Sequence, residues 1–224
     1  MHVDRSSPPP RPDTAARIPD VIPVFPLPNV VLFPGAYLPL HVFEPRYRDM
    51  VMDAVAGSRY IGMALLKEGW EEQYYRNPPI YEIGCVGRMV NVTPLADGRF
   101  DILLQGLARY EIREQLSDRP YRQARIALKL APASDSLGGP WRSELYRRLT
   151  DHLHRIDEEA SWRELLRLEV PDDILVNNLS MSLDLTPLER QFLLEAETIG
   201  QRARRLSDLI EFKRHERHDA RGLG

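Results

Sequence analysis

The side chains in this sequence that could do chemistry are few, and we first ask whether any of them could bind a metal ion. Two histidine pairs come nearest, His152 with His154 and His215 with His218. On a helix, a spacing of two residues turns side chains about 200° apart, so the first pair cannot share a metal ion. The second pair has a suitable spacing, but in a charged terminal helix a solvated face is the usual outcome. The sequence therefore predicts no metal site.

Motifs for phosphate binding and nucleophilic catalysis are also missing. The sequence contains no G-x-x-x-x-G-K-[ST] loop, G-x-G-x-x-G fingerprint, G-x-S-x-G elbow or H-E-x-x-H helix. The single cysteine, Cys85, stands in a strand-like run, where a buried inert thiol is typical. A nucleophile needs a base and an orienting group, and the spacing nominates neither. We predict no catalytic residue, no cofactor and no enzymatic activity, with an unrecognised hydrolase as an alternative.

One segment has the composition of a contact surface. Prolines and charged residues surround four aromatic side chains: Trp70, Tyr74, Tyr75 and Tyr81. Aromatic rings with a polar tip, placed on a loop, are typical contact residues for polypeptides. The alternative is that these rings cover the edge of an apolar core. We predict a polypeptide-binding loop here and keep the core cover as the alternative.

Overall composition narrows the class of protein. The 224 residues are 43% hydrophobic and 28% charged, which is typical of a soluble globular protein. Because 30 basic residues face 33 acidic ones, the net charge of -3 provides no basic field for nucleic acid or an anionic membrane. One cysteine allows no internal disulfide, which fits a cytoplasmic protein. The uncharged stretch Val21–Phe43 is long enough to cross a bilayer, but its five prolines exclude a membrane helix.

The first half of the chain has a β pattern with one helix. Strands are predicted at 21–25, 37–43, 60–66, 80–95, 100–105, 108–115 and 122–129, with a tight hairpin turn at Asp97-Gly98. A helix is predicted from Pro45 to just before Gly57. Its packed face is predicted to carry Tyr47, Val51, Ala54 and Val55.

Beyond the break at 137–140 the apolar period becomes helical. Helices are predicted near 141–156, 162–169, 172–182, 187–197 and 199–215, the last two being separate or one helix bent near Gly200. Ser161 with Glu164, and Thr186 with Glu189, have the spacing of capping boxes. The predicted organisation is a disordered proline-rich leader at 1–19, a β-rich subdomain at 20–135, a helical subdomain at 140–216 and a frayed tail at 217–224.

Several motifs resemble one known family. The run IPVFPLPNVVLFPGAYLPLHVFEPRYR at 22–48 closely resembles the opening of the Lon protease N-terminal domain, also called the LON substrate-binding domain. The segments 84–87, 97–98 and 105–112 resemble its following hairpin and Gly-Leu-x-Arg turn, and 185–195 with 202–209 resemble its helical half. The resemblance covers roughly 20–215. Lon continues into ATPase and protease modules, and this chain ends before either, so a stand-alone LON domain is expected.

The resemblance implies an α+β fold: a PUA-like β pseudo-barrel of about six strands plus a short helix, followed by a C-terminal α-helical bundle. The residues that match the family pattern are expected to be mainly structural: Pro26, Leu27, Phe33, Pro34, Pro39, Phe43, Glu44, Arg46, Gly106, Leu107 and Arg109. Glu44 and Arg46 are explained as a helix-start carboxylate with a pairing arginine. No family residue maps onto the aromatic loop.

The resemblance implies a non-enzymatic module that recognises polypeptides. Its partners would be unfolded or apolar polypeptide segments or a dedicated protein, with no membrane and no cofactor. A PUA-like RNA-binding protein is the alternative. An RNA reader needs a basic stripe to neutralise phosphates, which a near-neutral barrel does not supply. The sequence leaves the oligomeric state and the identity of the partner open.

Overall fold

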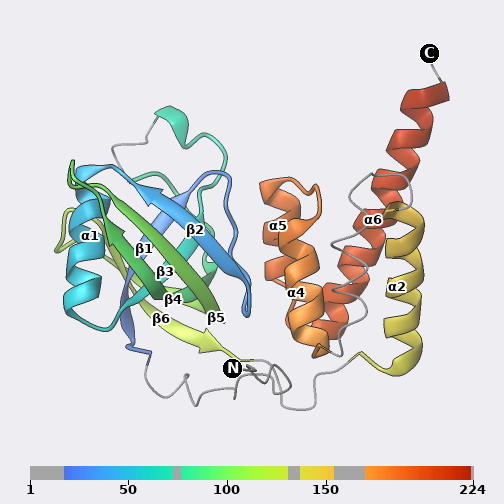
Figure 1. The fold of residues 1–224 in the computed structure, drawn as a ribbon, viewed down its shortest axis with the longest axis horizontal. Helices are drawn as coiled ribbons and strands as arrows, with labels where there is room; N and C mark the ends of the chain where they lie inside the picture. Colours follow the sequence, from blue (N-terminus) through green and yellow to red (C-terminus); the bar gives the residue numbers. More distant parts are fainter. Residues whose placement is uncertain (1–17, 73–76, 131–136, 154–169, 223–224) are drawn as a thin grey trace, which may run out of the picture.

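The computed structural model describes residues 18–72, 77–130, 137–153 and 170–222. Its elements are β1 (Val21–Leu27), β2 (Tyr37–Val42), α1 (Pro45–Ala56), β3 (Tyr60–Leu65), β4 (Ile83–Pro94), β5 (Phe100–Leu116), β6 (Arg122–Lys129), α2 (Gly139–Leu153), α4 (Asp172–Ser182), α5 (Pro187–Leu194) and α6 (Ile199–Gly222). The strands and α1 form one half, and the remaining helices stand beside it (Figure 1). The predicted α+β fold, with a PUA-like barrel followed by helices, is confirmed.

The strands close into a barrel through β5. The sheet order is β2-β5-β4-β3-β1-β6, and β6 pairs again with β5. β1 and β3 run parallel, whereas the other pairs are antiparallel. β5 pairs with β2 through residues 100–105 and with β6 through residues 109–116. The two parts of this long strand therefore have different neighbours along the same edge. β2 is left as an edge strand.

The prediction of two strands at 100–105 and 108–115 is wrong, because β5 runs unbroken through Gly106. Gly106 exchanges hydrogen bonds with the loop 33–36: its N–H donates to the Ala36 carbonyl and its carbonyl accepts from the Gly35 N–H, both at 2.8 Å. A Cβ at position 106 would lie 2.1 Å from the Phe33 carbonyl oxygen. The glycine therefore marks a close backbone approach rather than a strand end.

The predicted hairpin turn between β4 and β5 is confirmed. Gly98 has a φ of +78°, and its N–H donates to the Leu95 carbonyl at 2.9 Å. Within this turn Gly98 takes the left-handed conformation and Asp97 does not. Asp97 instead uses its carboxylate to accept the Arg99 N–H at 3.1 Å, which closes the turn with a side chain.

Helix α1 begins at Pro45 and ends before Gly57, as predicted, but its buried face differs by one position. Tyr47, Met50, Val51 and Ala54 are buried. Val55, predicted to pack, is 37% exposed. Val55 follows Tyr47 by eight positions, about 80° around the helix, so it lies at the edge of the apolar stripe, and the packing of α1 on the barrel leaves it exposed.

The apolar core has two clusters. One contains Ile22, Val24, Ala64, Tyr110 and other side chains of the barrel strands. The larger cluster joins α1 and the barrel to the helices α2, α4, α5 and α6. Because β3 is buried along its whole length, its two faces supply both clusters. The helical half therefore shares its core with the barrel, and its expected independence as a subdomain stays a prediction.

In the helical half the capping box at Thr186 is confirmed. The Thr186 hydroxyl accepts the Glu189 N–H at 3.2 Å, and the Glu189 carboxylate accepts the Thr186 N–H at 2.6 Å. Burial acts to raise the pKa of Glu189, but the Thr186 hydrogen bonds and Lys213 bring it below its ordinary value. α5 and α6 are separate helices, with the chain between them at 195–198. The predicted helix at 162–169 and the Ser161 box lie outside the described residues.

Two buried arginines meet at the end of α5, one from the barrel and one from α6. From β5, Arg109 donates to the Leu194 carbonyl at 3.2 Å and to the Glu197 carbonyl at 2.9 Å. From α6, Arg202 donates to the Leu193 carbonyl at 2.9 Å and reaches the Leu194 and Ala196 carbonyls at 3.4 and 3.3 Å. These guanidinium groups occupy the negative end of the α5 dipole.

Amide side chains complete this joint. Asn177 on α4 donates to the Pro34 carbonyl at 2.9 Å and accepts from Arg202 at 2.5 Å. Gln191 on α5 donates to the Ile83 carbonyl at 3.0 Å. Family-pattern residues Pro34, Gly106 and Arg109 thus lie at or against the contact between the two halves.

A candidate arginine-lined binding pocket

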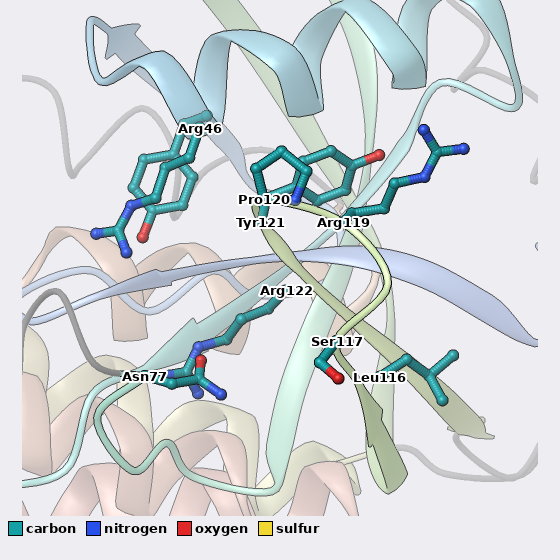
Figure 2. A pocket seen from close by; sticks show the side chains of 9 residues that line it. Arg46, Asn77, Leu116, Ser117, Arg119, Pro120, Tyr121 and Arg122 are labelled. Atoms are coloured by element: carbon teal, nitrogen blue, oxygen red, sulfur yellow. The ribbon is translucent and has the colours of Figure 1, made fainter.

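A pocket of about 200 Å³ opens on the barrel where three separate segments meet. They are the first turn of α1, the turn between β5 and β6, and the end of the loop before β4. The lining residues are Arg46, Tyr47, Asn77, Leu116, Ser117, Arg119, Pro120, Tyr121 and Arg122 (Figure 2). Ligand pockets for larger molecules usually hold about 300–1,000 Å³, so this one suits a single chemical group or side chain.

α1 supplies the first arginine. Pro45 starts the helix, which places Arg46 and Tyr47 in its first turn. The Arg46 guanidinium pairs with the Glu44 carboxylate at 3.0 Å and lies 4.6 Å from the centre of the Tyr47 ring. This confirms the predicted pairing of Glu44 with Arg46, and it orients the guanidinium along the pocket wall.

The β5–β6 turn supplies Arg119 and Tyr121 on the side of α1. The Arg119 guanidinium lies 3.4 Å from the Asp53 carboxylate, which also accepts the Tyr121 hydroxyl at 2.7 Å. Burial, together with the hydrogen bond and charge of Asp53, raises the pKa of Tyr121 to about 12. Figure 2 shows the Arg119 side chain running away from those of Arg46 and Arg122. Arg119 therefore belongs to the rim.

Arg122, the first residue of β6, is placed differently. Its side chain is half-buried and extends toward Asn77 (Figure 2). It donates to the Pro78 carbonyl and, at 3.3 Å, to the Gln115 side-chain oxygen. Burial lowers the pKa of Arg122, Tyr47 opposes this, and the nearby charge of Arg46 adds to the lowering. Both oxygens that these hydrogen bonds reach are neutral, so neither balances the charge of Arg122.

These groups can bind but are poorly suited to catalysis. The pocket offers guanidinium and hydroxyl donors, while the described residues that line it include no histidine, cysteine, aspartate or glutamate. A hydroxyl nucleophile needs an adjacent base, and the lining gives Ser117 none. The arrangement fits recognition of a small anionic or polar group.

The aromatic loop predicted as a contact surface borders this pocket. Trp70 is partly buried against the barrel cluster, and Tyr81 is partly buried against the larger cluster. The Lys67 ammonium lies 5.5 Å from the centre of the Tyr81 ring. Tyr74 and Tyr75 lie outside the described residues. For Trp70 and Tyr81 the packing favours the alternative, in which the rings cover the core edge.

Most family-pattern residues pack as expected, with two corrections. Phe33 and Pro26 are buried, and Leu27 and Leu107 pack partly buried against the clusters. Pro39 and Phe43 are exposed instead, Phe43 at 59%. Pro39 lies on the edge strand β2, where a missing N–H costs no ladder hydrogen bond. The Phe43 ring stacks 6.3 Å from the His41 ring on this outer face.

Of the pocket residues, the sequence reasoning named only Arg46 as a candidate, and there as a structural residue. Arg119, Tyr121 and Arg122 were missed because arginine in a turn or at a strand start is ordinary in a sequence with abundant arginine. The sequence feature that could have pointed to this site is the run at 119–122, in which two arginines flank a proline and a tyrosine. Asn77 carries another sign, since its φ of +72° is uncommon outside glycine.

Other chemistry is sparse in the part of the chain that is described. Burial raises the pKa of the Cys85 thiol to about 12, which fits the predicted inert cysteine. Among these residues no group of three or more His, Cys, Asp and Glu side chains could hold a metal ion. None of the described helices has the length and apolar character needed to span a bilayer.

The fold defines a class of α+β proteins in which a PUA-like barrel is joined to helices. Residues 21–211 match the ATP-dependent protease La (LON) substrate-binding domain. The chain belongs to this family.

Curated relatives and solved structures agree with the family match. The chain is 28% identical to the Lon protease of Roseiflexus castenholzii over 88% of its own length, and 31% identical to that of Trichlorobacter lovleyi over 89%. It spans about a quarter of the length of these proteases, 25% in both cases.

Two solved structures share the fold. The first, a Lon N-terminal domain protein from Xanthomonas campestris, is 25% identical with a TM-score of 0.59, the match covering 85% of this chain and 97% of that one. The N-terminal domain of a Mycobacterium avium complex Lon protease is 19% identical with a TM-score of 0.64, covering 85% and 98%. The second likeness concerns the fold alone.

Proposed function

We propose that this chain is a non-catalytic module that binds polypeptides, and that a bound polypeptide contacts the arginine-lined pocket and the adjoining loop 67–81. One observation carries the proposal: in a substrate-binding family, the pocket and the loop share residues. Asn77 lines the pocket, and the Pro78 carbonyl next to it accepts a hydrogen bond from Arg122. A polypeptide that filled the pocket would therefore also meet the loop.

The chemistry of the pocket supports binding over turnover. Guanidinium groups and tyrosine rings are the side chains that most often dominate protein interfaces. Trp70 and Tyr81 are partly buried, which leaves part of each ring accessible for contact while the core holds it in place. Anchors held in place before binding lose less side-chain entropy when a partner arrives.

The test is direct binding of an unfolded protein. Fluorescently labelled α-lactalbumin, reduced and alkylated so that it cannot refold, is titrated with the purified chain, and anisotropy reports the complex. Native α-lactalbumin with its disulfides intact is the matched control. Saturable binding of the unfolded form alone supports the proposal. Equal binding of both forms, binding of neither, or preferential binding of a single-stranded RNA oligonucleotide contradicts it.

The absence of catalysis needs its own measurement. The chain is incubated with ATP and unfolded casein, and phosphate release and peptide release are followed. We expect neither above the blank. Turnover that scales with protein concentration and survives further purification would show a catalytic function.

A further inference from the structure

The three arginines around the pocket differ in how their charges are balanced. Arg46 faces Glu44 at 3.0 Å, and Arg119 faces Asp53 at 3.4 Å. Arg122 has no carboxylate partner among the described residues; its recorded acceptors are the Pro78 carbonyl and the Gln115 side chain. Among the described residues, no recorded ion pair offsets the guanidinium charge of Arg122.

Three of the acids near the pocket lie on the α1 side, and a fourth, Asp118, stands in the β5–β6 turn between the lining residues Ser117 and Arg119. Glu44 precedes the helix, Asp53 lies within it, and the charge of Asp49 acts on Tyr121 from the same helix. The wall formed by Asn77 and Arg122 has no acid among its lining residues. An entering anion would therefore be attracted toward Arg122 and away from α1.

The surroundings of Arg122 are also unfavourable for its charge. Its guanidinium is partly withdrawn from water and lies near a second cation, Arg46, so its charge is destabilised by desolvation and by repulsion. A single negative charge beside Arg122 would offset both effects. Arg122 has five N–H donors in all, and its two recorded hydrogen bonds leave further donors for a planar acceptor.

We propose that the pocket binds one carboxylate group of a polypeptide, with Arg122 as the principal contact and Arg46 beside it. This inference rests on the proposed function and specifies its substrate: a polypeptide that presents an acidic side chain or its C-terminal carboxylate. A carboxylate fits because it is planar, carries one charge and is small enough for about 200 Å³. A phosphate dianion would bring twice the charge that Arg122 leaves unbalanced.

The experiment compares short peptides that differ in one group. Blocked peptides carry an internal glutamate, a glutamine or a phosphoserine, and a further peptide without acids has either a free C-terminal carboxylate or an amide. If the pocket binds a side-chain carboxylate, we expect the glutamate peptide to bind about tenfold more tightly than the glutamine peptide. If it binds a chain end, we expect the same gain for the free C-terminal carboxylate over the amide. The arm that shows this gain distinguishes a side-chain carboxylate from a chain end. Equal binding of acidic and neutral peptides, or tightest binding of the phosphopeptide, overturns the inference.

Variants of the chain test whether Arg122 contacts the carboxylate. Arg122→Gln should remove most of the tenfold gain, and Arg122→Lys should restore part of it because a charge returns without the planar fork. Arg125→Gln is the matched control, since Arg125 is an exposed residue of β6 that pairs with Glu114 at 3.3 Å. We expect Arg125→Gln to leave the affinity unchanged. Equal effects of Arg122→Gln and Arg125→Gln would overturn the assignment.

A second variant tests the charge argument in the opposite direction and does not depend on the stability of Arg122→Gln. Glu44→Gln removes the acid that pairs with Arg46, so it should strengthen binding of the carboxylate peptide severalfold. Unchanged or weaker binding by a folded Glu44→Gln chain contradicts the inference. If unfolded α-lactalbumin binds while the carboxylate has no effect, only this inference fails; if it does not bind at all, the proposed function fails with it.

Discussion

Replacing Arg202 by alanine tests whether the hydrogen bonds at the end of α5 are a main source of stability. The Arg202 residue is 5% exposed and donates to Leu193, Leu194, Ala196 and Asn177. Alanine removes every one of these donors together with the packed stem of the side chain. Some of the carbonyls keep another donor, as Leu194 does from Arg109 at 3.2 Å. The loss is therefore smaller than the sum of four separate hydrogen bonds.

The expected cost is about 3–5 kcal/mol in the free energy of unfolding. Each buried acceptor left without its donor costs about 1–3 kcal/mol, and the two most affected, Ala196 and Asn177, account for most of the total. Lost contact with the Phe33 ring, whose centre lies 5.6 Å from the guanidinium carbon, adds about 0.5–1 kcal/mol. Arg202→Lys should lie between the two, because an ammonium keeps the charge but cannot span the carbonyls.

The assay is urea unfolding, monitored by circular dichroism and tryptophan fluorescence. Arg204→Ala is the matched control: it is the same substitution on the same helix, at an exposed residue that stacks on Trp141 at 5.5 Å, and should cost below about 1 kcal/mol. If Arg202→Ala costs no more than Arg204→Ala, the reasoning is refuted, because other groups then satisfy the carbonyls at the end of α5.

Four further predictions follow from the fold. Gly106→Ala should lower the free energy of unfolding by about 2–4 kcal/mol in urea titrations, because its Cβ would overlap the Phe33 carbonyl oxygen; a neutral effect would contradict the close approach. The Cys85 thiol should react with a disulfide reagent only after unfolding, and rapid labelling of the native chain would disprove its burial. Glu189→Gln should lower the melting temperature at neutral pH, and this difference should shrink as the pH falls below 4.5, since a carboxyl with a depressed pKa contributes stability only while ionised; a constant difference would rule this out. Limited proteolysis should cut near Leu137–Pro140 before it cuts the β4–β5 hairpin, and the reverse order would count against two subdomains.

Local features of the sequence predicted most of the elements. Pro45 and Gly57 gave the ends of α1, Gly98 gave the hairpin turn, and the pair Thr186 and Glu189 gave the start of α5. These predictions succeeded because each depends on the backbone preferences of a few neighbouring residues, which act in any fold. The family motifs added the order of the two halves, which periodicity alone does not supply.

Features that depend on distant pairing were not predictable in this way. The passage of β5 through Gly106 depends on the loop 33–36, which lies far away in the sequence and meets it only after folding. The exposure of Val55 likewise reflects where the barrel lies relative to α1. In both cases the local sequence pattern was compatible with more than one structure, and tertiary contacts determined which one forms.

The sequence by itself determined an α+β chain with a β-rich first half, a helical second half and no catalytic or phosphate-binding motif. Only the tertiary structure decided that Arg46, Asn77 and Arg122 line one pocket, because the closure of β6 onto β1 and β5 brings the three segments together. It also decided that Arg109 and Arg202 meet at the end of α5. A guanidinium acquires its role from the charges and carbonyls around it, and those surroundings exist only in the folded chain.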